Sequence, residues 1–178
     1  MKTLKLTLLL LLAASFGIHA QTQLPALPPD GFVTLQQIVN DFSTAPDAAL
    51  QKYSGLRILV YGRVDRIQPA DDLNEDPLAV IMQLPNQSSP DVKAVFSQDQ
   101  IDGGTMSISG DGSKVNIYHR DWAGNVTGKS AFVESGDMVG IRGTFDNQVA
   151  GEIVLKNCFK LSPEALNQKL AEHGIPTE

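Results

Sequence analysis

The sequence has few of the residues from which catalytic and metal sites are built. The chain of 178 residues contains one cysteine and three histidines. No spacing of His, Cys, Asp and Glu matches a known metal-binding motif. No glycine-rich stretch is followed by the GK[ST] of a phosphate loop, and no serine stands in the context of a nucleophile elbow. We therefore expect no catalytic residue, no metal and no cofactor.

The single cysteine, Cys158, excludes an internal disulfide. In a compartment that receives exported proteins, a lone cysteine is most often a buried thiol that acts as a small apolar group. The alternative is an intermolecular disulfide or a reactive thiol. The sequence favours the buried thiol.

Basic and aromatic residues are also scarce. The chain has 14 Lys and Arg against 20 Asp and Glu, a net charge of −6, and only 6% of its residues are aromatic. Nucleic-acid affinity comes mostly from lysine and arginine that displace counterions from phosphates. An acidic chain repels a phosphate backbone at long range, so this composition disfavours nucleic acid as a partner.

Long hydrophobic runs are absent after the N-terminus. Residues 1–20, "MKTLKLTLLLLLAASFGIHA", combine a short basic start, an apolar run and a small residue at Ala20. This layout is typical of a secretory signal peptide and too short for a stable membrane span; an uncleaved N-terminal anchor is the alternative. We expect a mature chain without a membrane span, exported to the periplasm or, as the alternative, outside the cell. The proline-rich residues 21–33 are expected to form a flexible lead-in.

What the sequence does contain is a change of periodicity. Apolar residues at helical spacing predict a helix that begins at Thr34, and Thr34 with Gln37 resembles a capping box. A short second helix is expected to end near Gly55. Near the C-terminus, "SPEALNQKLAEHG" carries helix start and stop residues and predicts a helix over about 163–173.

Between these helices the period becomes two, which predicts about five strands. They are "RILVYGRVDRI", "PLAVIMQL", "DVKAVFS", "GDMVGIRGTF" and "EIVLKNCFKL". Gly62, Gly140 and Gly143 interrupt otherwise well-patterned strands, where glycine permits sharp bending. A small closed barrel needs such bends and leaves no open edge. We predict a mainly β, five-stranded OB-fold-like barrel over about 55–161, with a long insertion at about 98–135 between strands three and four.

Short motifs within these strands carry a family resemblance. The matching pieces are "KYSGLRILVYGRVDRI", "DVKAVF", "SGDMVGIRG" and "GEIVLKNC". They resemble the tRNA-anticodon-like (tRNA_anti-like) family of OB-fold proteins, which is found among exported bacterial proteins. The resemblance covers about residues 49–161 and implies the fold. It carries no catalytic signature, and a fold alone does not transfer a function.

The strands offer one candidate binding patch. Tyr61 and Arg63 share a face of the first strand, and Arg142 in the fourth strand adds a further cation. The alternative is an ordinary solvated outer face. Phe96, in the third strand, is expected in the core rather than on a base-stacking surface, because it shares a side with Val92 and Ala94.

The insertion contains the densest chemistry, "NIYHRDWAG". Tyr118, Arg120 and Trp122 are candidate contacts for a partner or ligand, since binding loops often extend from a rigid scaffold. Loop packing is the alternative for all three. His119 and Asp121 are the only support for an enzyme, and they match no known catalytic arrangement.

The function expected from these observations is that of an exported, non-enzymatic OB-fold module. It would bind a protein, peptide or polymer of the cell envelope. The alternative is a weak binder of single-stranded nucleic acid or another anionic oligomer, which would use Arg57, Tyr61, Arg63 and Arg142. An enzyme of unknown activity is the third. The sequence indicates neither the ligand nor the oligomeric state.

Overall fold

The computed structural model describes residues 24–69, 77–85, 90–100 and 105–176. The predicted signal peptide at 1–20 and the first part of the lead-in lie outside these ranges. The elements are β1 (Phe32–Thr34), α1 (Leu35–Thr44), α2 (Pro46–Tyr53), β2 (Arg57–Gln68), β3 (Leu78–Met82), β4 (Asp91–Phe96), the 3₁₀ helix η1 (Gln98–Gln100), β5 (Thr105–Ile108), β6 (Lys114–Arg120), β7 (Val126–Glu134), β8 (Met138–Val149), β9 (Glu152–Lys160) and α3 (Pro163–Glu172).

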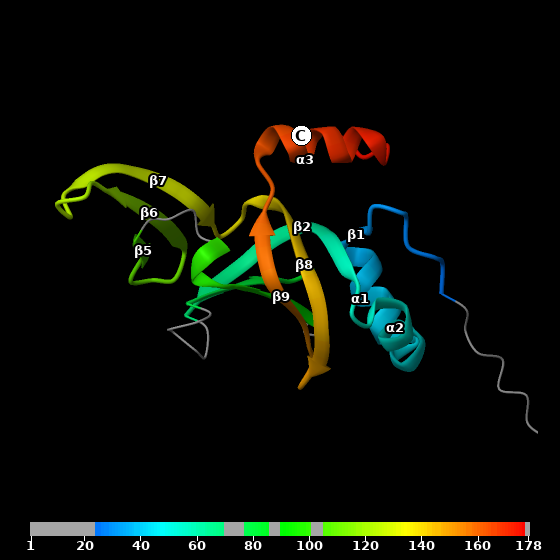
Figure 1. The fold of residues 1–178 in the computed structure, drawn as a ribbon. Coiled ribbons are helices and arrows are strands. Elements are labelled where there is room, and N and C mark those ends of the chain that lie inside the picture. Colours follow the sequence, from blue (N-terminus) through cyan, green and yellow to red (C-terminus); the bar gives the residue numbers. More distant parts are fainter. Residues whose placement is uncertain (1–23, 70–76, 86–89, 101–104, 177–178) are drawn as a thin grey trace, which may run out of the picture.

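Five strands close into a barrel in the order β2, β3, β4, β9, β8 and back to β2. The closing pair is antiparallel, with Val60 opposite Ile141, and β4 runs parallel to β9. The long, curved strands β2 and β8 are visible in Figure 1. The predicted mainly β, OB-fold-like barrel with N-terminal and C-terminal helices and a long insertion is thereby confirmed.

The helices cover different parts of the barrel. The Thr34 side chain caps α1 by accepting a hydrogen bond from the Gln37 N–H, as the capping residues predicted. The apolar face of α1 lies in the main core, where the ring of Phe42 stacks on that of Phe145 with centroids 5.6 Å apart. Helix α3 instead covers the outer face of β2, where Leu166 and Leu170 pack on Leu59. Both faces of β2 are therefore buried along part of its length.

The interior glycines allow close approach. An added Cβ at Gly62 would lie 2.7 Å from Leu35 Cβ, and one at Gly140 would lie 2.7 Å from Leu166 Cδ1. At Gly143 it would lie 2.6 Å from the Sγ of Cys158, which is fully buried as predicted. The absent side chains let α1, α3 and β9 pack directly on the wall. The pairing of β8 with β9 is also irregular between Arg142 and Thr144, so the bending predicted there accompanies a bulge.

The insertion folds as a second sheet of three antiparallel strands, β5, β6 and β7. We call residues 105–134 the arm. Its base joins the barrel core through Val115, Ile117 and Val133, whereas Figure 1 shows the β6–β7 hairpin extending away from the barrel. Tight turns join β5 to β6 and β6 to β7.

One expectation needs correction. Phe32 and Val33, expected in a flexible lead-in, are buried and form β1, which pairs in parallel with β2. Asp30 just before them is held by Lys169 and His173 of the C-terminal segment. The proline-rich composition of this segment predicted flexibility, but two of its apolar residues pack on partners that lie far away in the sequence.

Candidate functional site

The turn between β6 and β7 is built around one carboxylate. Asp121 Oδ1 accepts hydrogen bonds from the backbone N–H groups of Ala123 and Asn125, both at 2.9 Å. Asp121 Oδ2 accepts a further bond from the Asn125 side chain at 3.1 Å. These bonds, led by that of the Asn125 side chain, lower the pKa of Asp121. The turn is thus ordered by its own hydrogen bonds.

Trp122 follows Asp121 in this turn and is 99% exposed. Tryptophan is usually well buried because its large ring gains more than most side chains from leaving water. Here a local hydrogen-bond network holds the backbone of the turn while the ring remains in solvent. Such an aromatic anchor on an ordered backbone is characteristic of protein-binding hot spots.

The other two predicted arm residues lie next to the turn. Tyr118 is opposite Lys129 in the β6–β7 pairing, and Lys129 Nζ lies 5.5 Å from the centre of the Tyr118 ring. Arg120 donates to the Gly124 carbonyl at 2.7 Å and to Thr105 Oγ1 at 3.3 Å. We call Tyr118, Arg120, Trp122 and Lys129 the tip surface. Lys129 was not among the predicted residues, because a register shift between His119 and Arg120 is needed to place it opposite Tyr118.

The three residues predicted on the barrel strands line three different recesses. Tyr61 lines a groove beneath α3, and Arg63 lines a recess with Gln83 and Ser135. Arg142 lines a third recess, beside Asp30 and Gly31. Helix α3 packs on Leu59 on this side of β2 and lines the groove at Tyr61, whereas the recesses at Arg63 and Arg142 include no residue of α3.

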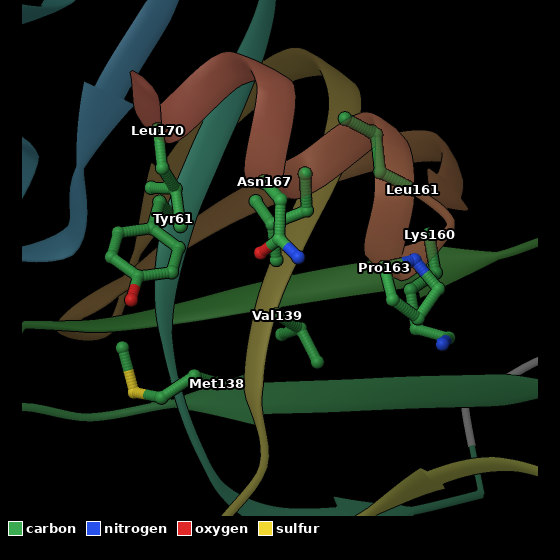
Figure 2. Close-up of a pocket in the computed structure, with 9 residues that line it drawn as sticks. Tyr61, Met138, Val139, Lys160, Leu161, Pro163, Asn167 and Leu170 are labelled. Carbon is green, nitrogen blue, oxygen red and sulfur yellow. The ribbon is translucent and has the colours of Figure 1, made fainter. Parts of the chain in front are cut away.

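The groove beneath α3 has a volume of about 230 Å³ and mostly apolar walls. Figure 2 shows Tyr61 and Met138 towards one end, Lys160 and Pro163 towards the other, and Asn167 of α3 between them. Sites for drug-sized ligands usually exceed about 300 Å³. A groove of this size suits a single apolar side chain better than a whole small molecule.

The face formed by β3 and β4 is where OB barrels commonly bind ligands. Here its outward residues Ala79, Ile81 and Val95 are buried. Phe96 lies in the core, as predicted, with its ring edge-on to Phe132 at 5.4 Å between centroids. This face therefore does not present aromatic rings for stacking bases.

His119 and Asp121 do not act as a pair. His119 Nε2 lies 3.2 Å from Ser130 Oγ, whereas the Asp121 carboxylate accepts hydrogen bonds from residues of the turn. Within the described ranges, no cluster of three or more His, Cys, Asp and Glu side chains is placed to hold a metal ion. None of the helices described is both long and apolar enough to cross a bilayer.

A family model described as tRNA_anti-like matches residues 13–159, which is most of the chain. The chain belongs to the tRNA_anti-like family. This confirms the resemblance found in the strand motifs, and the closed barrel is the OB-like fold expected of a tRNA_anti-like protein. Comparisons with curated proteins and with solved structures find no match.

Proposed function

We propose that this tRNA_anti-like protein is an exported, non-enzymatic binding module of the cell envelope, and that it contacts a partner protein through the tip surface of the arm. The observation that carries the proposal is the complete exposure of Trp122 on an ordered turn. The N-terminal sequence supports export, with the periplasm as the expected compartment.

The surroundings of Trp122 favour a protein partner. Tyr118 and Arg120 are, with tryptophan, the residue types most enriched at interface hot spots. Their positions are already set by contacts with Lys129, Thr105 and Gly124, so binding would order few additional side chains. Val126, 51% exposed at the start of β7, adds apolar surface beside the turn.

Nucleic acid is disfavoured on two grounds. The chain is acidic overall, and the buried outer face of β3 and β4 lacks a stacking platform. The family and the fold suggest a binding module. His119 and Asp121, the only support for an enzyme, hydrogen-bond to different partners, Ser130 and the β6–β7 turn.

The test is a crosslinking pull-down from the native envelope, with the exported chain carrying a C-terminal tag. A partner recovered with the wild type and lost in Trp122→Ala supports the proposal. Val149→Ala is the matched control, because Val149 is also well exposed but lies at the end of β8, in the barrel. Equal recovery with Trp122→Ala, or loss with both variants, contradicts a specific contact at the arm. Cell fractionation tests export separately.

A further inference from the structure

Two arginines on neighbouring strands line one recess on the outer wall of the barrel. In the antiparallel pairing of β2 with β8, Arg57 is opposite Thr144 and Leu59 is opposite Arg142. The arginines are thus diagonal neighbours on one face, with Cα atoms separated by about 7–8 Å in such a pairing. We call the recess between them, of about 240 Å³, the arginine notch.

Both guanidinium groups retain unused hydrogen-bonding capacity. Arg57 stacks over the Phe159 ring, 4.9 Å from its centre, and has no hydrogen-bond acceptor within the described part of the chain. Arg142 has only the Asp30 carbonyl there, at a long 3.5 Å. A guanidinium carries five N–H donors in a planar fork, so most of these donors are available to a ligand.

The carboxylate of Asp30, which also lines the notch, already has other hydrogen-bond partners. Asp30 Oδ2 accepts from Lys169 Nζ at 3.0 Å and lies 3.1 Å from His173 Nε2, while Oδ1 accepts from the Phe32 N–H. Asp30 therefore turns its backbone carbonyl, not its carboxylate, to Arg142. The notch concentrates positive charge on a chain whose net charge is −6.

The remaining walls are apolar. Leu27, Pro28, Pro29 and Leu56 complete the lining. Two guanidinium forks match the paired oxygens of a carboxylate, and apolar walls favour a carbon group beside the charge. We propose that the arginine notch binds a carboxylate attached to a small apolar group. This site is separate from the tip surface and does not depend on it.

The test is a titration of residues 21–178 with N-acetyl-leucine as the probe. Binding is detected by ¹H–¹⁵N correlation spectra of the protein. Concentration-dependent shifts at the amides of Gly31 and Leu56, with none at Trp122, are expected. Arg142→Gln and Arg57→Gln should each weaken binding about tenfold, the usual order for one lost charge-assisted interaction. Arg63→Gln, an arginine of the same strand outside the notch, should bind like the wild type.

Two further probes test which chemical groups the arginine notch recognises. N-acetyl-leucinamide has the same apolar group without the carboxylate and should cause no shifts, and inorganic phosphate should bind more weakly than N-acetyl-leucine. Equal binding of the amide, unchanged binding in both glutamine variants, or shifts confined to residues outside the notch would overturn the proposal. Trp122→Ala should leave probe binding unchanged, so failure of the arm contact and failure of the notch are distinguishable.

Discussion

Aromatic side chains of the barrel core and of the arm's tip lie in opposite environments. In the barrel, Phe145 is 3% exposed and stacks on Phe42, whereas Trp122 on the arm is 99% exposed. Strand β2 is packed on both faces over part of its length, and α3 also approaches β8 closely at Gly140. The side chains of β7, by contrast, are mostly exposed to solvent. Stability should therefore come mainly from the barrel and its helices, and recognition from the arm.

The largest effect on stability is expected at Asp41, which lies in one of the helices that cover the barrel. This nearly buried carboxylate accepts hydrogen bonds from Tyr53 Oη at 2.6 Å and from Lys52 Nζ at 2.7 Å, and so joins α1 to α2. Burial of Tyr53 and, to a smaller extent, its hydrogen bond to Asp41 raise the pKa of Tyr53 well above its ordinary value. Asp41→Ala leaves a buried cation and hydroxyl without a partner, and should lower the free energy of unfolding by about 3–5 kcal/mol.

Urea denaturation measures this loss. Asp146→Ala is the matched control, because Asp146 pairs with Lys156 on the surface and should contribute under about 1 kcal/mol. Equal losses in the two variants would contradict the importance assigned to the helical pair.

A second prediction compares glycines in the two regions. Gly143→Ala places a methyl group 2.6 Å from the buried Cys158 sulfur and should destabilise the barrel by about 1–3 kcal/mol. Gly110→Ala, on the arm, has nothing within 4 Å and should change stability by less than about 0.5 kcal/mol. Thermal melting checks both; an unchanged melting temperature in Gly143→Ala would contradict the close packing of β9 on β8.

A smaller effect is expected from pH. Burial tends to raise the pKa of Asp30, but the hydrogen bonds from His173, Lys169 and the Phe32 N–H outweigh it and hold this pKa well below its ordinary value. Asp30 therefore stabilises the fold above about pH 4, and this contribution is lost as the pH falls through the lowered pKa.

Because Asp30 is partly exposed, the contribution should be about 1 kcal/mol or less. Comparing the stability of wild type and Asp30→Asn from pH 2 to 7 measures it. The difference between them should shrink at the acidic end, and a difference that grows there would show the sign to be wrong.

The smallest effect on stability is expected at the arm itself. Trp122→Ala removes a side chain that buries almost nothing, so the free energy of unfolding should change by less than about 0.5 kcal/mol. Partner recovery should nevertheless be lost. Urea denaturation beside the pull-down checks both halves, and a large loss of stability would show that Trp122 packs against the protein in solution.

Local patterns predicted most of the barrel. Alternating apolar residues located its strands, and the capping residues Thr34 and Ser162 located the starts of two helices. They could not locate β1, because Phe32 and Val33 are too few to show a period. Phe32 is buried between β2 and α3, and Val33 is buried in the main core. Short strands depend on partners that local sequence does not reveal.

The candidate sites were less predictable. Tyr118, Arg120 and Trp122 were identified because they are adjacent in the sequence and one turn holds them together. Arg57 and Arg142 were both named as candidate residues for an anionic oligomer, but the arginine notch was not predicted. The two residues are 85 positions apart along the chain and come together only through the pairing of β2 with β8. Nor could composition reveal that Asp30 is occupied by Lys169 and His173.

The sequence by itself determined the family, the five strands of the barrel and the absence of a recognisable catalytic motif, because each follows from spacing within short segments. Only the tertiary structure decided which polar side chains share a surface. Tyr61, Arg63 and Arg142 line three separate recesses, and only the groove at Tyr61 lies beneath α3, because Leu166 and Leu170 dock on Leu59 there. Trp122 stays in solvent because the arm joins the core only at its base, so no other described element covers its tip.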